Sequence, residues 1–377
     1  MHVLIPALHR PVKPTGVCRH AVNLAQCLAD HDKIQRVTLL IGSWQREYFE
    51  QAFNLNSAKI ELVDVEIKNS SISRNLWFLF GLPKLAQQLQ PDIIHMSFPF
   101  PFIRQWFTGK VVATIHDLYP YECPDNFGYP QVWFNQLFLQ QCIHSSDGLI
   151  NVSNCTLESL KAYFPKAKTA KQAAVVYNVV EFSDVDSYRP HQLKHQLSAP
   201  FLMTVAQHRK NKNLNLLIEA YGQLLNHDKL PENSKLLLVG SAGPETEALK
   251  ALVQALKLEE NVHFLSGLAD EELRWLYEHA SLFVIPSSTE GFCLPLVEAV
   301  TFGCPAVCSD IPIFREVGSS QCRYFSLDQM AAENLAQAMV AELSHTSRQD
   351  NFVDHRFSRQ EISGQLLDFY ISLAHAN

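Results

Sequence analysis

The sequence lacks an excess of positive charge. Its 377 residues include 31 lysines and arginines against 38 aspartates and glutamates, so the formal net charge is −7. It also lacks a long apolar run. The apolar run at the N-terminus extends for only about six residues, which is too few for a signal peptide or a membrane span. No internal repeat or low-complexity tract is present. We therefore expect no nucleic-acid partner, and an anionic ligand would need a local cationic pocket.

The nine cysteines contain no CxxC pair. Cys304 and Cys308 lie on either side of Pro305, an arrangement that disfavours a metal site. Scattered thiols in a chain of this size are typical of a reducing compartment. We therefore expect a cytoplasmic protein with reduced cysteines.

Short apolar runs alternate with longer stretches of helical periodicity along the chain. The expected strands are residues 2–7, 37–41, 60–65, 93–96, 111–115 and 148–152, then 201–205, 235–239, 262–265, 282–285 and 306–308. The expected helices include residues 17–29, 132–144, 215–225, 245–256 and 270–279, the last with Asp270 as its cap. Several strands are continuously apolar, which is typical of parallel strands covered on both faces. Repeated β-α-β units predict an α/β fold with two doubly wound, Rossmann-like sheets.

A polar segment, residues 179–200, separates two α/β blocks of similar length. We expect an N-terminal domain over residues 1–180 and a C-terminal domain over residues 181–357. A final helix within residues 358–377 would pack back on the N-terminal domain. Ligands of doubly wound sheets bind at the carboxyl ends of the strands, so we expect the two sheets to face each other across a cleft that holds the site.

The stretch SSTEGFCLPLVE, residues 287–298, is expected to join a strand to a helix. Gly291 permits a sharp backbone bend, and Pro295 suits the first turn of a helix, where its missing N–H costs nothing. That helix would end at Gly303. The N–H groups near Phe292 and Leu294, together with the positive end of the helix, predict an anion site.

Glu290 and Glu298 flank this predicted anion site. Both carboxylates would repel a phosphate, so we expect them to accept hydrogen bonds from hydroxyl groups instead. A ligand that is anionic in the middle and hydroxylated at both ends is a sugar nucleotide. The alternative is that Glu290 is a surface turn residue and that Glu298 only stabilises the first part of the helix.

Cations follow the strand expected at residues 201–205. The cluster comprises His208, Arg209, Lys210 and Lys212. Cations at the carboxyl end of a strand can neutralise a departing diphosphate and so stand in for a metal ion. A solvated basic turn is the alternative.

Two residues of the first half are also candidates. His116 ends the strand at residues 111–115, where an imidazole can donate to a sugar hydroxyl or to developing charge, although a satisfied core histidine is the alternative. Gly16 lies where the first strand meets the first helix, and a single glycine there is a weak signal of a nucleotide-binding turn. His95 also ends a strand, and we expect it to be a satisfied core histidine.

Residues 286–317, PSSTEGFCLPLVEAVTFGCPAVCSDIPIFREV, resemble the E-x7-E signature of retaining GT-B glycosyltransferases, specifically glycosyltransferase family 4. The stretches KLLLVGSAG, NVHFLSGLADEEL and ADEELRWLYEHASLFVIPS match that family in order and spacing. TGVCRHAVNLAQCL, ATIHDLYP, DGLINVSNCT and VVYNVVE resemble its landmarks in the first half, so the resemblance covers essentially the whole chain. It departs from the family where Cys293 and Ala206 replace glycines and where Gln207 occupies the usual arginine position.

The resemblance implies a retaining hexosyltransferase that needs no metal ion or cofactor and uses a nucleoside-diphosphate sugar, with UDP-glucose as the best guess, as co-substrate. Lys212 and Arg209 would hold the leaving diphosphate, Glu290 the hydroxyls of the transferred sugar, and His116 would contact that sugar. The other implied donor-binding residues are Gly16, Gln207, Val239, Gly240, Gly267, Leu268, Gly291, Phe292, Cys293, Leu294 and Glu298, the last on the ribose diol. No protein nucleophile is implied.

The acceptor is a glycan or a lipid-linked sugar by the same resemblance, in polysaccharide or glycoconjugate biosynthesis. Two alternatives stay open: a sugar-nucleotide 2-epimerase, which needs no acceptor, and a catalytically silent sugar-nucleotide-binding subunit. The apolar stretches at residues 75–82 and 97–107 most simply pack as core or surface. Their second interpretation is contact with a lipid, or weak peripheral contact with the inner face of a membrane.

Overall fold

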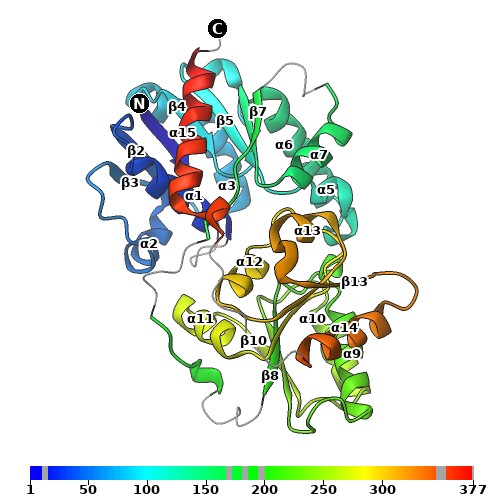
Figure 1. The fold of residues 1–377 in the computed structure, drawn as a ribbon. Helices are drawn as coiled ribbons and strands as arrows, with labels where there is room; N and C mark the ends of the chain where they lie inside the picture. The colour runs from blue at the N-terminus through cyan, green and yellow to red at the C-terminus, as the bar shows by residue number, and fades with distance from the viewer. Residues whose placement is uncertain (11–15, 167–171, 181–185, 194–199, 345–353, 376–377) are drawn as a thin grey trace. The chain divides into compact units, whose positions relative to one another are not determined.

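The computed structural model (Figure 1) describes residues 1–10, 16–166, 172–180, 186–193, 200–344 and 354–375. The chain forms two compact units. The first comprises Met1–Glu181 with His355–Asn377, and the second comprises Phe182–Asp354. The polar segment expected to separate two domains, residues 179–200, lies partly outside the described residues.

The first unit is built on a seven-stranded sheet in the order β3-β2-β1-β4-β5-β6-β7, with every neighbouring pair parallel. Its strands are β1 His2–Pro6, β2 Arg36–Gly42, β3 Ile60–Val65, β4 Ile93–Met96, β5 Lys110–Ile115, β6 Gly148–Asn151 and β7 Gln172–Val175. The strand order reverses between β1 and β4. In doubly wound sheets, the carboxyl ends of the strands at such a point form the ligand-binding crevice.

Helices cover both faces of this sheet. They are α1 Gly16–Ala29, α2 Arg46–Ala52, α3 Ser71–Leu76, the π-helical turn η2 Trp77–Gly81, α4 Leu82–Leu89, α5 Tyr119–Glu122, α6 Gln131–Ser145, α7 Asn154–Tyr163 and α15 Arg359–His375. Successive strand residues point to opposite faces, so Val3 and Ile5 enter one core while Leu4 enters the other. The first core includes side chains of α1 and α15.

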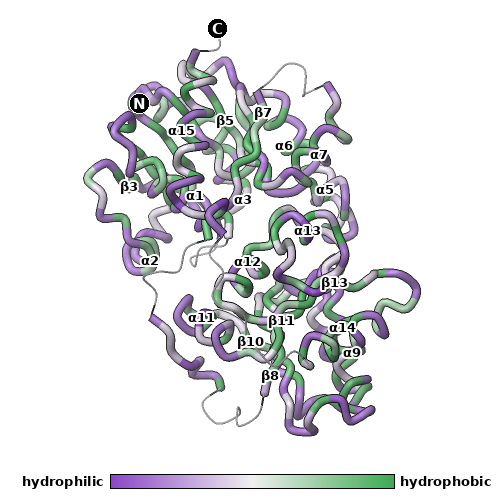
Figure 2. The backbone as a smooth tube through the Cα atoms, in the orientation of Figure 1, coloured by the Kyte–Doolittle hydropathy of each residue, from purple (hydrophilic) through white to green (hydrophobic). Residues whose placement is uncertain are grey.

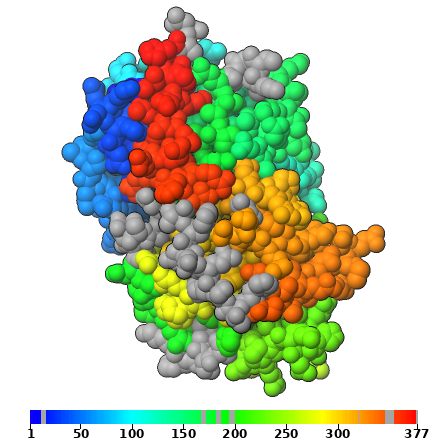
Figure 3. All heavy atoms as spheres, in the orientation of Figure 1, coloured from blue at the N-terminus to red at the C-terminus, as the bar shows by residue number. Residues whose placement is uncertain are grey.

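Helix α15 is the last element of the chain, yet it belongs to the first unit. Leu366 and Tyr370 are fully buried in the same core as α1, and Ser363 donates a hydrogen bond to the carbonyl oxygen of Cys27. Figure 1 shows α15 beside α1, and Figure 3 shows it on the surface of the unit between the N-terminal segments and β7.

The second unit has a six-stranded parallel sheet in the order β10-β9-β8-β11-β12-β13. Its strands are β8 Phe201–Val205, β9 Lys235–Val239, β10 Val262–Leu265, β11 Leu282–Ile285, β12 Ala306–Ser309 and β13 Arg323–Phe325. Its helices are α9 Leu214–Asn226, α10 Thr246–Ala255, α11 Asp270–His279, α12 Leu294–Thr301, α13 Pro312–Gly318 and α14 Ala331–Leu343. The strand order reverses between β8 and β11.

The expected α/β fold with two Rossmann-like sheets is confirmed, and the central strands are among the most hydrophobic segments of each unit (Figure 2). Two strands were not predicted, β7 and β13. Both lie at sheet edges, where burial is partial. β13 has only three residues, whereas β7 overlaps the apolar run of residues 173–176, which the prediction missed. The expectation that Asp270 caps its helix is wrong. The helix begins at Asp270, and Ala269 occupies the cap position, where its N–H donates to Glu272 Oε2 over 3.0 Å.

Among the described residues, no helix combines the length and the hydrophobicity that crossing a lipid bilayer requires. The nine cysteines all lie within the described residues, and none of them forms a disulfide bond.

Candidate functional site

In the second unit, the strand order reverses where β8 and β11 run side by side, so the segments that follow these two strands meet. The 3-10 turn η6, Lys210–Lys212, follows β8. Asn211 Nδ2 donates to the carbonyl oxygen of Thr289 over 3.1 Å, and Asn213 Nδ2 donates to that of Pro286 over 2.9 Å. Asn213 has φ 48°, a left-handed conformation that asparagine tolerates better than most residues. The asparagines therefore join the basic turn to the end of β11.

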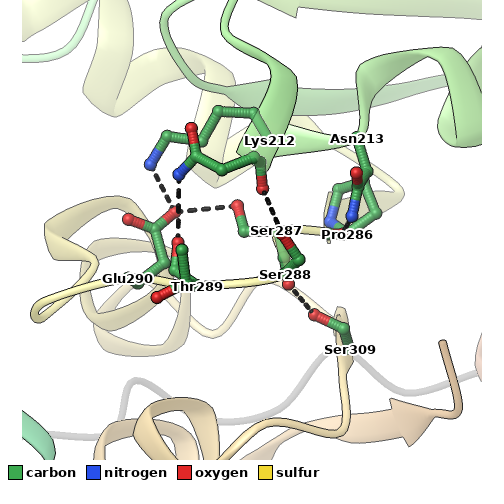
Figure 4. Close-up of polar contacts among 9 residues, drawn as sticks. Lys212, Asn213, Pro286, Ser287, Ser288, Thr289, Glu290 and Ser309 are labelled. Carbon is green, nitrogen blue, oxygen red and sulfur yellow. Dashed lines mark hydrogen bonds and ion pairs between the residues drawn. The ribbon is translucent and has the colours of Figure 1, made fainter. Parts of the chain in front are cut away.

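Lys212 and Glu290 form an ion pair at this junction (Figure 4). Lys212 Nζ lies 2.6 Å from Glu290 Oε1, which also accepts a hydrogen bond from Ser287 Oγ over 2.8 Å. The side chain of Lys212 is 14% exposed and that of Glu290 is 7% exposed. Glu290 is thus not a surface turn residue. Its carboxylate contacts the largely buried cation of Lys212 and the hydroxyl of Ser287, in a region where charges interact more strongly than they do in water.

Helix α12 begins just beyond Glu290. Cys293 precedes it at the cap position, and Pro295 lies in its first turn, as the sequence predicts. The first N–H groups of a helix have no intrahelical acceptor, and the first turn of α12 contains no acidic side chain that would offset the positive end of the dipole. Gly291 and Phe292 are buried in the turn that leads into the helix. Lys212 and the mouth of α12 are therefore close neighbours in one polar site.

Glu298 lies further along α12 and accepts a hydrogen bond at Oε2 from the hydroxyl of Tyr277 over 2.8 Å. Tyr277 is fully buried on α11, and burial together with the charge of Glu298 raises its pKa well above the ordinary value. The phenol therefore stays protonated and keeps donating, which orients the carboxylate. Sequence reasoning missed Tyr277, because an aromatic residue on a helical face signals core packing and not a polar contact.

Cys293 adopts a left-handed backbone conformation, with φ 72° and ψ 68°. This explains why a glycine is usual at the position in the family it resembles. The thiol is buried, and burial, followed by the nearby charge of Glu290, raises the pKa of Cys293 well above its ordinary value. A neutral buried thiol is a poor nucleophile, so the residue is a packing group within the site.

Replacing Cys293 by glycine or by alanine gives a test of this conformation. Both changes remove the thiol, so the difference in unfolding free energy between the two variants reports the cost of the left-handed backbone conformation. Left-handed backbone costs an L-residue about 1 kcal/mol and costs glycine almost nothing. We expect the Cys293→Gly variant to be more stable than Cys293→Ala by about that amount in urea unfolding. If the alanine variant were the more stable, Cys293 would not hold this conformation.

Five of the implied donor-binding residues lie at or just beyond the carboxyl ends of β8, β9 and β10: Gln207, Val239, Gly240, Gly267 and Leu268. The backbones are close there. The N–H of Ala206 donates to Val239 O over 2.9 Å, and the N–H of Gly240 donates to Leu265 O over 2.8 Å. A Cβ atom on Gly240 would lie 1.9 Å from the carbonyl oxygen of Ala206. This close approach of the two backbones requires glycine at position 240, whether or not a ligand binds there.

The basic cluster is smaller than expected, because His208 is not part of it. Its Nδ1 pairs with Thr246 Oγ1 over 2.9 Å, and its ring packs edge-on against Phe264. Burial lowers the pKa of His208, so its imidazole is neutral at physiological pH and the expectation of a cation there is wrong. Arg209 lies directly before η6 and is partly exposed, whereas Lys210 is exposed.

In the first unit, His116 lies beyond β5 with Nε2 2.9 Å from the carbonyl oxygen of Ser97. A carbonyl only accepts, so Nε2 carries the proton. Burial lowers the pKa of His116, so the ring is neutral and Nδ1 is an acceptor. The expectation that this imidazole donates to a sugar hydroxyl is therefore wrong: the ring can only accept there.

Gly16 is the first residue of α1, and a Cβ atom on it would meet nothing within 4 Å.

His95 is a satisfied core histidine, as expected. Its Nε2 pairs with Thr114 Oγ1 over 2.7 Å, and its Nδ1 contacts the hydroxyl of Tyr370. His20 Nε2 lies 3.3 Å from the same threonine oxygen, and the ring of His20 packs edge-on against His116. Burial lowers the pKa of His95 to about 3.

This lowered pKa predicts loss of stability in acid. The unfolded chain binds a proton at His95 near pH 6.5 while the folded chain does not, so the free energy of unfolding falls as pH drops below that value. Each such histidine contributes a slope of up to about 1.4 kcal/mol per pH unit. We expect His95→Gln, which keeps a donor and an acceptor, to reduce the slope measured by urea unfolding between about pH 4 and about pH 6.5. An unchanged slope would contradict this assignment.

Among the described residues, no group of three or more histidine, cysteine, aspartate or glutamate side chains is arranged to hold a metal ion.

Two family models match the chain. Residues 14–184 match glycosyltransferase family 4, and residues 189–355 match the glycosyl transferases group 1. The O-antigen chain mannosyltransferase RfbU of Salmonella typhimurium is 28% identical over 355 residues, covering 90% of this chain and 91% of that protein. The O-antigen chain mannosyltransferase B of Escherichia coli is 25% identical, covering 80% and 81% of the two chains.

Solved structures give the same fold at low identity. Sucrose-phosphate synthase from Thermosynechococcus elongatus covers 100% of both chains with a TM-score of 0.75 at 17% identity. Anabaena HepE, in complex with UDP and glucose, covers 99% of this chain and 100% of its own with a TM-score of 0.65 at 18% identity. These matches span both units of the structure. The chain therefore belongs to glycosyltransferase family 4 and is a glycosyltransferase with the GT-B fold.

Proposed function

We propose that this glycosyltransferase moves a hexose from a nucleoside-diphosphate sugar to a hydroxyl of a glycan acceptor, with retention of the anomeric configuration and without a metal ion. The observation that carries the proposal is the buried Lys212–Glu290 pair beside the mouth of α12. It combines a cation, a helix N-terminus and a carboxylate, which are the groups that a diphosphate joined to a sugar requires.

The leaving diphosphate gains negative charge as the bond to the sugar breaks. Donors fixed in place before the reaction stabilise such charge best, because they need not reorganise. Lys212 is held by Glu290 and is almost buried, and the first-turn N–H groups of α12 are fixed by the helix. Arg209, directly before η6, is the second cation in this proposal and takes the place of the arginine that Gln207 replaces.

Glu290 and Glu298 act as acceptors for hydroxyl groups in this account. Ser287 and Lys212 both engage Oε1 of Glu290 and so orient the carboxylate that accepts from the hydroxyls of the transferred sugar in this account. Tyr277 engages Oε2 of Glu298 and orients the carboxylate that we assign to the ribose diol. Neither carboxylate is then an acid–base catalyst, and each is oriented by a donor of the protein.

The reaction uses no protein nucleophile. The Cys293 thiol is neutral, which removes the one thiol of the site from that role. His116 accepts a hydrogen bond from a hydroxyl of the sugar through Nδ1. The acceptor hydroxyl attacks the anomeric carbon through an oxocarbenium-like transition state, the bond to the diphosphate breaks, and the departing phosphate oxygen takes the hydroxyl proton.

The relatives favour mannose as the transferred sugar. The two relatives described above are named O-antigen chain mannosyltransferases. Their names favour mannose over the glucose expected from the sequence. By the same likeness, the acceptor is a growing O-antigen-type glycan in polysaccharide biosynthesis, with the enzyme working on the cytoplasmic side of the membrane.

Incubating the protein with single sugar nucleotides, GDP-mannose and UDP-glucose first, tests the proposal. We expect release of the nucleoside diphosphate from one donor, unaffected by EDTA, and transfer of its sugar to an O-antigen oligosaccharide with the anomeric configuration kept, as read by NMR. Product from donor alone, with an inverted centre at C2, would indicate the epimerase. No turnover of any donor would contradict an active transferase.

A further inference from the structure

Helix α3 and the turn after it carry a row of large apolar side chains on the surface of the first unit. Ile72, Leu76 and Phe80 are 74%, 52% and 49% exposed. Residues four apart on a helix are neighbours on one face, so the three side chains form a continuous row. A contiguous apolar surface of this kind marks a site of interaction.

The π-helical turn η2 keeps this row in line. In an uninterrupted α-helix, residues eight apart drift by about 80° around the axis. Here the N–H of Leu82 bonds to Trp77 O, five residues back, so the turn holds more residues than an α-helical one and reduces the drift. A Cβ atom on Gly81 would lie 2.4 Å from the indole of Trp77, so glycine is required for that ring to lie against the turn.

A tryptophan from a distant loop extends the row. Trp106 lies in the 3-10 turn η3, Arg104–Trp106, and its ring centroid is 5.8 Å from that of Phe80. It is 37% exposed. Tryptophan is enriched where hydrocarbon meets water, because its ring is apolar and its N–H is polar. We refer to Ile72, Leu76, Phe80 and Trp106 as the α3 patch.

The segments that form the α3 patch contain cations and no carboxylates. Residues 67–90 and residues 93–110 include no aspartate or glutamate. Lys68 and Lys84 are exposed, four residues before Ile72 and four after Phe80, so a lysine flanks each end of the row. Arg10 Nη1 donates to Ser71 Oγ over 3.1 Å and adds a third cation at the start of α3.

A second apolar surface of the same unit differs in charge. Around α6, the side chains of Tyr129, Trp133, Phe134 and Leu137 are each more than half exposed. Residues 119–145 contain Glu122 and Asp125 but no lysine or arginine. This α6 surface therefore has the hydrophobic component without the cations, which makes it a matched control for the α3 patch.

We propose that the α3 patch docks the protein on a lipid bilayer with anionic headgroups. The four apolar side chains would enter the interfacial region while Lys68 and Lys84 lie against the headgroups, as on other amphipathic surfaces that bind membranes. Because cations flank the apolar side chains, an anionic bilayer fits this surface better than the groove of another protein does. The proposal concerns the first unit alone and does not depend on the identity of the donor.

Co-sedimentation of the full chain with vesicles tests this. We expect binding to mixed phosphatidylglycerol–phosphatidylcholine vesicles and much weaker binding to phosphatidylcholine alone. Leu76→Ser/Phe80→Ser should weaken binding at least about 30-fold. Lys68→Gln/Lys84→Gln should weaken it by about the same factor, given about 1 kcal/mol per lysine. The control Trp133→Ser/Leu137→Ser should bind as the parent does.

Absence of binding to the mixed vesicles, or equal weakening by the α6 control, would overturn the proposal. A second measurement does not depend on how the serine variants fold. Brominated phospholipids quench tryptophans near the bilayer, so the quenching should be reduced in Trp106→Phe and retained in Trp133→Phe. The opposite result would assign docking to the α6 surface.

Discussion

Replacing Lys212 by methionine is expected to slow sugar transfer strongly and to destabilise the second unit at the same time. The substitution removes the cation beside the mouth of α12, and loss of one preorganised group that stabilises a leaving group typically reduces turnover by about 10²–10³-fold. It also leaves the buried carboxylate of Glu290 without its cation, which costs about 3–5 kcal/mol. Donor turnover and urea unfolding would be measured on the same preparation.

The double variant Lys212→Met/Glu290→Gln separates these two effects. Neutralising the carboxylate removes the unpaired buried charge, while Ser287 can still donate to the glutamine oxygen, so most of the stability should return. Transfer should stay low, because no cation faces the diphosphate. Lys210→Met, at the exposed neighbour, should change neither quantity much. Recovery of turnover together with stability would show that the pair serves folding alone.

Replacing Gly240 by alanine is expected to destabilise the second unit more than most point changes. The new Cβ would lie 1.9 Å from the carbonyl oxygen of Ala206 and 2.7 Å from its carbon, and both are backbone atoms that cannot rotate away. Relief requires the ends of β8 and β9 to separate, which breaks the bond from the Ala206 N–H to Val239 O. We expect a loss of about 3 kcal/mol or more in urea unfolding.

Gly16→Ala is the matched control for Gly240→Ala. A Cβ atom on Gly16 meets nothing within 4 Å, so stability should change by only a few tenths of a kcal/mol. If the free space at Gly16 serves a ligand, its variant should lose turnover while it keeps stability. Equal destabilisation by the two alanine substitutions would contradict the close approach at Gly240.

Much of the fold could be predicted because buried parallel strands appear in the sequence as continuous runs of apolar residues. The strands β8 to β11 fall at the predicted residues for this reason. β13 could not be predicted in the same way, because it has only three residues and two of them are partly exposed. β7 was missed although it overlaps the apolar run of residues 173–176. The helix that begins at Leu294 was predicted from local chemistry, a glycine bend followed by proline in the first turn.

The candidate site was predictable in its residue types but not in its pairings. The sequence placed Lys212 and Glu290 each in a turn that follows a strand, but their ion pair depends on β8 lying beside β11, which only the folded structure shows. The bond from Tyr277 to Glu298 likewise joins two helices. The proton position on His116 depends on the carbonyl of Ser97, and the neutral state of His208 depends on burial. Such contacts leave no periodic signal in the sequence.

The departures from the family pattern now have physical accounts. Cys293 takes a left-handed conformation that a glycine would adopt without strain, and its thiol stays neutral. Ala206 approaches Gly240 through its backbone carbonyl, a contact that a glycine at position 206 would make equally. Neither departure removes a group that the proposed donor needs.

Calorimetric titration with a nucleoside diphosphate in the presence of EDTA tests the central claim most directly, because it reports on the diphosphate site without any acceptor. GDP and UDP would be titrated into the parent protein and into Lys212→Met/Glu290→Gln, whose fold is expected to be retained. The account predicts binding by the parent that EDTA does not change, and an affinity at least about 10-fold weaker in the double variant. Equal affinities for the two proteins, or binding that disappears in EDTA, would contradict a diphosphate site built from Lys212 and the mouth of α12.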